Sequence, residues 1–277
     1  MEITVTLVKE LRNKTSAGMM DCKKALMETS GDMEQAVDVL RTKGLAAISK
    51  RSAKAAKEGL MRIKISADGK KAAMVEINCE TDFVANNDKF KVFADKALDI
   101  VFEKSKEVIG QKEVTDLIGE VGASFGENIK IGRAEVLSTE GSFVSYIHLD
   151  NKLGVIVELS AKILSPEIER VGKDITLQVA ASNPACVSAQ DASKDIKDIL
   201  DRERKIYKEQ VKDKPANIID KIVEGKVAKF LKQICLLDQP FVKDPEVSVK
   251  KYLQEKSKTL GEEISVKSFV RIRIGEE

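Results

Sequence analysis

Residues 59–83 read GLMRIKISADGKKAAMVEINCETDF, and the spacing of their apolar side chains decides the fold class. From Leu60 to Ile65 the side chains alternate with the two-residue period of a β-strand. The sequence ADGK at 67–70 is a hairpin signal, and a second apolar run follows it. We therefore predict a β-hairpin over this stretch.

The sequence after the hairpin predicts a helix. Its apolar side chains recur at helical spacing, and the expected buried face consists of Phe90, Phe93, Ala94, Ala97, Leu98 and Val101. Asn86 or Asn87 is suited to cap its beginning. A hairpin followed by a helix is an α+β unit, and we assign it to residues 59–130.

A similar pattern recurs in residues 131–188. Strands are predicted near 131–138, 142–149 and 152–160, and a helix follows Pro166. The apolar face of that helix is predicted to contain Ile168, Val171, Ile175 and Val179. The sequence therefore predicts an α+β fold with two similar core halves, which suggests an internal duplication.

Helical segments are predicted on the N-terminal side of the core. Residues 1–45 contain three short apolar periods separated by TSAG at 15–18 and TSGD at 29–32, which predicts a three-helix module. Gly31 suits a left-handed C-cap, Asp32 suits an N-cap, and Gly44 is expected to close the third helix. Residues 46–58 are rich in Ala and Lys and are predicted to be a linker.

Further helices are predicted after the core. Residues 189–234 carry two narrow apolar stripes on either side of KDKPAN at 212–217, which predicts an inserted antiparallel coiled-coil hairpin. The predicted stripes are Ile196, Ile199, Ile206 and Val211, then Ile219, Val223, Val227, Phe230 and Ile234, with Pro215 in the first turn of the second helix. Residues 235–265 are predicted to form a C-terminal helical module with a turn and a helix. Residues 266–277 are predicted to return to the core as a strand.

Composition limits the possible functions. Among 277 residues, 33% are charged but the net charge is only +2, which argues against a nucleic-acid-binding protein. The four cysteines lie far apart, so neither a zinc site nor a disulfide framework is expected. There is one histidine and no glycine motif for phosphate binding, so we predict no enzyme, no cofactor and no direct nucleotide binding.

The location in the cell is predicted from what the sequence lacks. The first residues do not have the pattern of a secretory signal, and no apolar run approaches the roughly 20 residues of a membrane helix. We therefore expect a soluble, cytoplasmic protein without membrane contact.

Apolar residues in loops are the remaining candidates for a binding site. The first is TDFV at 81–84, in which either Phe83 or Val84 packs against the incoming helix or the loop offers both to another molecule. The second is the pair Met19 and Met20, which either close the three-helix core or form an adaptable contact surface. His148 alone is interpreted as a surface or half-buried residue.

Six segments in the same order along the chain resemble the elongation factor Ts family, the guanine nucleotide exchange factors of elongation factor Tu. The first two are highly specific, and the resemblance spans nearly the whole chain. The segments are LVKELRNKTSAGMMDCKKALMETSGDMEQAVDVLR at 7–41, VEINCETDFVANNDKF at 75–90, GENIKIGR at 126–133, SYIHLDNKLGVIVEL at 145–159, VAASNP at 179–184 and DQPFVKDPEVSVKKYL at 238–253.

The resemblance implies a fold, a partner and contact residues. It implies a ubiquitin-associated type of N-terminal module, and a loop at Thr81, Asp82, Phe83 and Val84 that inserts beside the partner's nucleotide and displaces Mg²⁺. It also implies contacts to elongation factor Tu from the N-terminal module, to which we assign Met19 and Met20. In the second core half, His148 matches a contact position.

Two alternatives remain beside nucleotide exchange. The N-terminal module alone would suit an adaptor that binds other proteins, although this leaves TDFV without a role. The basic residues of the linker would suit an RNA- or ribosome-associated protein, against which the near-zero net charge argues. Whether the helical hairpin joins two complexes into a dimer of heterodimers stays open.

Overall fold

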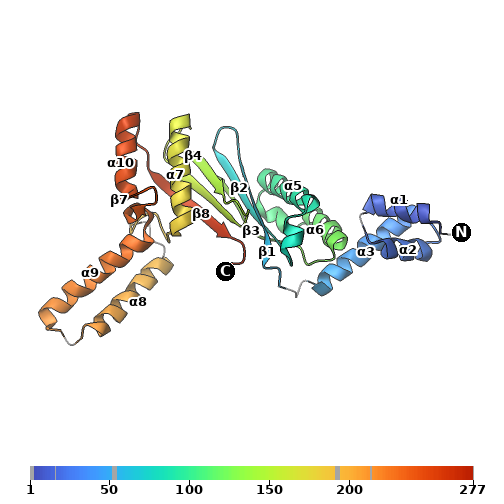
Figure 1. The fold of residues 1–277 in the computed structure, drawn as a ribbon, viewed down its shortest axis with the longest axis horizontal. Helices are drawn as coiled ribbons and strands as arrows, with labels where there is room; N and C mark the ends of the chain where they lie inside the picture. The colour runs from blue at the N-terminus through green and yellow to red at the C-terminus, as the bar shows by residue number, and fades with distance from the viewer. Residues whose placement is uncertain (1–2, 16, 52–54, 191–193, 213, 277) are drawn as a thin grey trace.

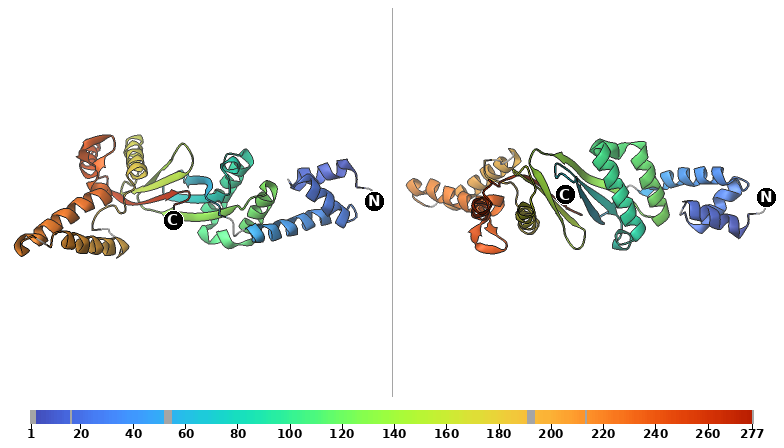
Figure 2. Two further views of the ribbon diagram at one scale, coloured as in Figure 1. Left: turned by 60° about the horizontal axis from the view of Figure 1, so that its bottom comes forward. Right: turned by 90° about the horizontal axis from the view of Figure 1, so that it is seen from above.

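The computed structural model describes residues 3–15, 17–51, 55–190, 194–212 and 214–276. The protein is an α+β structure in which two three-stranded antiparallel sheets form the centre and helices cover their outer sides (Figure 1). The N-terminal helices lie at one end of the long axis, and a helical hairpin projects near the other end (Figure 2).

The first sheet contains the predicted hairpin and one later strand. Its order is β1 (Glu58–Ile65), β2 (Lys71–Cys79) and β3 (Lys130–Ser138). The turn forms at the predicted ADGK sequence, where Gly69 adopts a left-handed φ of 72° and Asp68 accepts a hydrogen bond from the Lys70 amide at 3.0 Å. The middle strand, β2, is almost entirely buried, because both of its edges are paired and both of its faces are covered.

The second sheet repeats this arrangement. Its order is β4 (Ser142–Ile147), β5 (Leu153–Leu159) and β8 (Val266–Arg273). In both sheets the second strand of a hairpin is central, and a strand from later in the chain pairs with its free edge. The predicted C-terminal strand is therefore confirmed, and it completes the second sheet.

The assignment of residues 131–138 to the second half is wrong. These residues form β3, which pairs with β2, so the strand belongs to the first sheet. The sequence places this strand only a few residues before β4, but backbone pairing with a strand far back in the chain decides its position. The first sheet therefore extends to Ser138.

The inner faces of the two sheets pack against each other. A cluster of buried side chains from both sheets fills the space between them: Met61, Ala72, Met74, Phe143, Ile156, Ile272 and Ile274. The edges of the two sheets are also joined. The Met61 amide donates to the Asn151 carbonyl at 2.7 Å, and the Phe143 amide donates to the Gly69 carbonyl at 2.8 Å.

The outer face of the first sheet is covered by helices. They are α5 (Asp88–Lys104), the short 3₁₀ helix η1 (Lys106–Gly110) and α6 (Lys112–Phe125). Asn87 caps α5 by accepting from the Lys89 amide at 2.9 Å, and all six residues predicted for its inner face are buried. The sequence prediction did not include α6.

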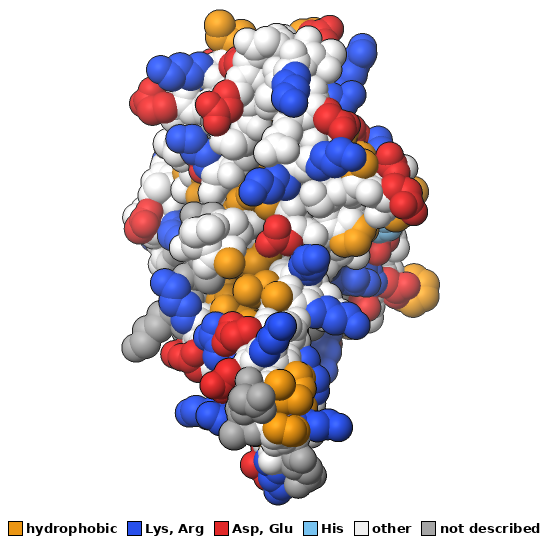
Figure 3. All heavy atoms as spheres, turned by 90° about the vertical axis from the view of Figure 1, so that its left-hand side faces the viewer, with side chains coloured by type: hydrophobic (Ala, Val, Ile, Leu, Met, Phe, Trp, Pro, Cys, Tyr) orange, Lys and Arg blue, Asp and Glu red, His pale blue; other side chains and the backbone are white. Residues whose placement is uncertain are grey.

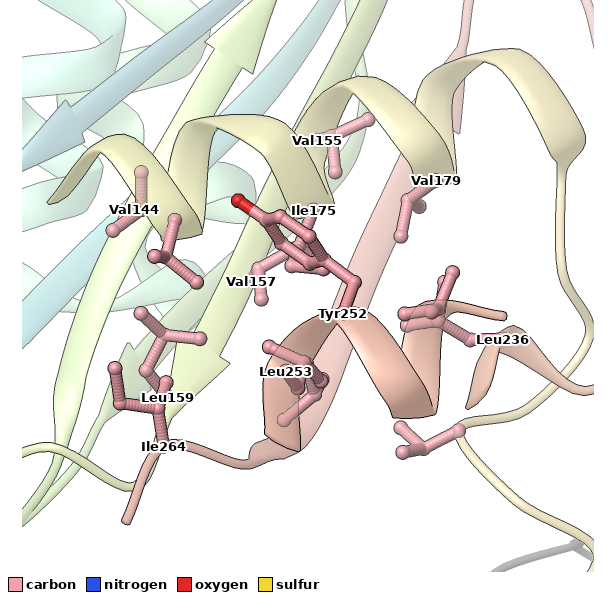
Figure 4. Close-up of a cluster of buried hydrophobic side chains, with 14 of the residues drawn as sticks. Val144, Val155, Val157, Leu159, Ile175, Val179, Leu236, Tyr252, Leu253 and Ile264 are labelled. Carbon is pink, nitrogen blue, oxygen red and sulfur yellow. The ribbon is translucent and has the colours of Figure 1, made fainter. Parts of the chain in front are cut away.

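The outer face of the second sheet is covered by α7 (Pro166–Ser182) and α10 (Val249–Leu260). The four apolar residues predicted on α7 are buried, and Ser165 caps the helix beside Pro166. In Figure 4 the Tyr252 ring from α10 lies against the α7 side of this core, among Ile175, Val179 and Leu253. A small hairpin, β6 (Pro240–Phe241) and β7 (Asp244–Ser248), precedes α10 where only a turn was predicted.

The N-terminal module has the three predicted helices, α1 (Val5–Thr15), α2 (Met19–Glu28) and α3 (Met33–Arg51). Gly31 has a left-handed φ of 89°, and Asp32 accepts from the Gln35 amide at 2.9 Å, as the predicted caps require. The third helix does not stop at Gly44 but continues to Arg51, which shortens the predicted linker. Residues 52–54 of that linker lie outside the described residues.

The helical hairpin consists of α8 (Lys194–Gln210) and α9 (Ala216–Ile234), followed by the 3₁₀ helix η2 (Leu236–Asp238). The inner face of α8 consists of Ile196, Leu200 and Tyr207, and Val211 joins the same core just after the helix. The predicted stripe residues Ile199 and Ile206 are exposed. These inner residues are spaced by four, seven and four positions, as on one face of an α-helix. Pro215 is the N-cap of α9 and not in its first turn.

The surface at this end of the molecule carries charges of both signs. Figure 3 shows lysine, arginine and acidic side chains interspersed over this face, with apolar side chains between them. Within the described residues, no helix combines the length and apolar character that crossing a membrane requires.

Candidate protein-binding site

The TDFV loop, defined as residues 81–84, lies between β2 and α5 and forms most of the one-turn helix α4 (Asp82–Ala85). Thr81 has an extended backbone, with φ −127° and ψ 154°, and its hydroxyl accepts from the Val84 amide at 3.4 Å. This is the geometry of an N-cap, which lets the chain turn from a strand into a helix without an unpaired amide. Residues 81–84 therefore form an ordered loop.

Two neighbouring apolar residues of the TDFV loop have opposite environments. Val84 is 8% exposed and packs with Ala85 into the core of the first half, whereas Phe83 is 84% exposed. The first interpretation is therefore confirmed for Val84, which fixes the loop to its own core, whereas Phe83 lies in solvent. A large aromatic side chain held in water is a candidate for contact with a partner.

The backbone of the TDFV loop is held by side chains from outside it. The buried Cys79 thiol donates to the Thr81 carbonyl at 3.1 Å. The Glu127 carboxylate accepts hydrogen bonds from residues 80 and 81. The Asp82 side chain is exposed, and among the described residues no hydrogen bond involves its carboxylate. Asp82 and Phe83 are thus both available to another molecule.

Cys79 and Cys235 should be unreactive toward alkylating agents in the native protein. Burial raises the pKa of each thiol to about 12, and the Glu127 charge adds to the effect at Cys79. A thiol with this pKa is almost wholly protonated at pH 8, and only the thiolate reacts. We expect iodoacetamide to modify both cysteines readily in guanidinium chloride but not in buffer at pH 8, as measured by peptide mass spectrometry. Native labelling of Cys79 at the denatured rate would contradict this burial.

The turn between β4 and β5 lies at the same end of the sheets as the TDFV loop. Lys152 pairs with Glu58 at 2.6 Å, and this hydrogen bond, together with the charges of Glu58, Asp150 and Asp82, raises the Lys152 pKa. Glu58 lies opposite Cys79 in the first sheet, two residues before Thr81, so its ion pair with Lys152 places the turn beside the strand end from which the TDFV loop leaves. The two segments predicted to contact a partner therefore lie near each other.

His148 begins this turn and is exposed. Its Nδ1 atom forms a hydrogen bond with the Tyr146 hydroxyl at 2.8 Å, and the two rings lie edge to face. The next residue, Leu149, is 93% exposed and was not among the predicted contact residues. An apolar residue inside the otherwise polar turn HLDNK was the signal that could have identified it.

Met19 and Met20 of the N-terminal module differ in exposure, as Val84 and Phe83 do. Met19 packs partly into the module core, whereas Met20 is 62% exposed. Met27, which was not selected, is 61% exposed and lies seven residues after Met20, on the same side of α2. The module lies at one end of the long axis (Figure 1), where α3 packs against α6 and where Arg12 and Asn13 of α1 line a hollow together with Asn87 and Lys89.

The fold and the TDFV loop define a class of protein. An ordered loop that holds an aromatic side chain in solvent is typical of a protein that binds another protein. A family model described as "Elongation factor TS" matches residues 80–276. The chain belongs to the elongation factor Ts family.

Individual relatives support the same assignment over nearly the whole chain. Elongation factor Ts of Clostridium perfringens (strain SM101 / Type A) is 44% identical over 286 residues, covering 99% of this chain and 93% of the relative. Elongation factor Ts of Nitratidesulfovibrio vulgaris (strain DP4) is 42% identical over 286 residues, covering 100% of this chain and 97% of the relative. Family membership supports a role in translation elongation as a nucleotide exchange factor.

Proposed function

We propose that this protein is a guanine nucleotide exchange factor that binds elongation factor Tu in its GDP form and promotes release of GDP. Family membership supports the partner, and the 84% exposure of Phe83 on an ordered loop is the observation that supports the site. The role involves no bond chemistry. The protein itself binds neither nucleotide nor nucleic acid in this proposal.

The physical basis of exchange is a difference in affinity. In a GTPase, Mg²⁺ joins a phosphate oxygen of the nucleotide to protein oxygens, and backbone amides hold the remaining phosphate oxygens. An exchange factor binds the nucleotide-free state more tightly than the GDP state. Thermodynamic reciprocity then requires that it weakens the binding of GDP and Mg²⁺ by the same factor.

Each residue of the TDFV loop has a role in this proposal. Phe83 inserts between elements of the partner as an apolar wedge, and Asp82 disturbs the charges and hydrogen bonds that hold Mg²⁺. Thr81 and Val84 hold the loop in place through the N-cap and the core contact. His148, Met19 and Met20 are proposed as further contacts that add affinity.

The test of this function is the release of fluorescent GDP from elongation factor Tu against excess unlabelled nucleotide. We expect release to accelerate when this protein is present at a small fraction of the partner concentration, because each molecule acts repeatedly. An acceleration that requires equimolar protein, or none at all, would overturn the proposed function and leave the adaptor interpretation.

Replacing Asp82 by asparagine should weaken exchange in a manner that depends on Mg²⁺. The substitution keeps the size of the side chain but removes its charge, so we expect about a tenfold loss of release rate in millimolar Mg²⁺. The loss should be much smaller when EDTA has removed the metal. Asp88→Asn, a change of an exposed carboxylate six residues later, is the control and should have little effect in either buffer. Equal losses with and without Mg²⁺ would show that Asp82 acts independently of the metal.

A further inference from the structure

Glu127 lies beside the TDFV loop although it is 46 residues from Thr81 in the sequence. Helix α6 ends at Phe125, and the left-handed φ of 70° at its C-cap Gly126 lets the chain reverse before β3 begins. The segment from Glu127 to Lys130 therefore passes next to the end of β2. A half-buried carboxylate is brought to the start of α4.

The Glu127 carboxylate accepts three hydrogen bonds from the two residues that precede α4. One oxygen, Oε2, accepts from the Glu80 amide at 3.0 Å and from the Thr81 amide at 3.1 Å. The other oxygen, Oε1, accepts from the Thr81 hydroxyl at 2.6 Å. Hydrogen bonds to a charged acceptor are stronger than those between neutral groups. The contact therefore fixes both the backbone and the side chain at this point.

The hydrogen bonds of Glu127 are linked to the N-cap of α4, and a further hydrogen bond returns from residue 80 to residue 128. Because the Thr81 hydroxyl donates its only proton to Glu127, its oxygen is free to accept from the Val84 amide. The Glu80 carboxylate accepts from the Asn128 amide at 2.7 Å, so residues 80–81 and 127–128 hold each other reciprocally. Glu127 thus contacts both the N-cap residue of α4 and the residue before it.

The helix that carries Phe83 needs such support. Four residues are too few for a helix to be stable by itself, because the conformational entropy lost in forming the first turn exceeds the stabilisation from its hydrogen bonds. Phe83 is exposed, so it gains no burial in the free protein that would hold it in place. Its position depends on Val84 packing into the core on one side, and on the hydrogen bonds of Cys79 and Glu127 to residues 80 and 81 on the other.

We infer that Glu127 is a positioning residue for exchange: it holds the TDFV loop in the conformation that presents Phe83 to the partner. This inference rests on the proposed function of the loop. Without the carboxylate, two amides and a hydroxyl lose their acceptor, and the loop adopts further conformations. The rate then falls with the fraction of molecules that still present Phe83 correctly.

The experiment is a double-mutant cycle on the catalysed release of GDP. Glu127→Ala, Glu127→Gln, Phe83→Ala and the Glu127→Ala/Phe83→Ala double variant are compared by kcat/KM for release. The control is Glu158→Ala, which removes a half-buried carboxylate of the second sheet that accepts from the Thr139 and Ser268 hydroxyls at 2.6 and 2.7 Å. Like Glu127, it is half-buried and accepts hydrogen bonds with both carboxylate oxygens, but it accepts two instead of three and lies in β5 of the second sheet.

Glu127→Ala should lower kcat/KM about tenfold when Phe83 is present, and by less than about twofold when Phe83 is already alanine. Glu127→Gln, whose amide oxygen can still accept from the two backbone amides, should restore part of the rate. Glu158→Ala should lower the unfolding temperature by a similar amount but leave kcat/KM unchanged.

Three results would overturn the inference. The first is a normal kcat/KM for Glu127→Ala beside a low value for Phe83→Ala, which rejects Glu127 but keeps the proposed function. The second is the same loss from Glu127→Ala with and without Phe83, which makes its role general stability. The third is a normal kcat/KM for Phe83→Ala, which rejects the proposed function and with it this inference.

Discussion

Phe83→Ala is expected to slow the catalysed release of GDP from elongation factor Tu about 100-fold, while the free energy of unfolding changes by no more than about 0.5 kcal/mol. The two effects separate because Phe83 is 84% exposed and contributes almost nothing to its own fold. An aromatic side chain that becomes fully buried only in a complex is the type of residue that dominates binding energy. The cost of its removal should therefore appear only in the presence of the partner.

The measurement is the rate of release by stopped-flow fluorescence, together with thermal unfolding of the free protein. Ile163→Ala is a matched control, because Ile163 is also an apolar loop residue and is 76% exposed, but it lies in the segment between β5 and α7. We expect this variant to promote GDP release from elongation factor Tu at the same rate as the parent protein. Equal rates for Phe83→Ala and the parent would contradict the role of the TDFV loop.

Phe90→Ala is expected to destabilise the protein by about 3–5 kcal/mol. Phe90 is fully buried, and its ring lies 5.9 Å from that of Phe93 and 6.3 Å from that of Phe125. The substitution leaves a cavity where α5, α6 and the first sheet meet, and the surrounding backbone cannot close it. The first half of the core should therefore lose much of its stability.

Urea unfolding followed by circular dichroism measures this loss directly. Phe83→Ala is the matched control, because the same substitution seven residues earlier removes an exposed ring and should leave the unfolding midpoint unchanged. A midpoint for Phe90→Ala equal to that of the parent would contradict the packing of α5 against the first sheet. Comparing the two variants separates the buried Phe90, which stabilises the fold, from the exposed Phe83, which we propose contacts the partner.

Local sequence patterns predicted the parts of the fold that depend on neighbouring residues. The hairpin, the caps at Asp32 and Asn87, and the buried face of α5 follow from turn chemistry and apolar spacing. The position of β3 did not follow, because its pairing with β2 joins segments more than 50 residues apart along the chain. In α8 the inner face contains Leu200 and not Ile199, a choice made by contact with α9.

The candidate site was predictable to a similar extent. The sequence alone indicated that an apolar residue of the TDFV loop could face either way, and only the fold separates Phe83 from Val84. The contact of Glu127 with Thr81 has no local signal, since the two residues come together only when the end of α6 returns to the first sheet. Resemblance to a family supplied the partner, which neither composition nor spacing could name.

The central claim is that the protein stabilises the nucleotide-free state of elongation factor Tu through the TDFV loop. Its most direct test is the dissociation constant of the complex, measured by isothermal titration calorimetry with nucleotide-free partner and with partner saturated by GDP and Mg²⁺. We predict that the nucleotide-free partner binds at least about 100-fold more tightly, and that Phe83→Ala greatly reduces this ratio. Equal affinity for the two states would contradict the account, because a protein that does not distinguish them cannot release the nucleotide.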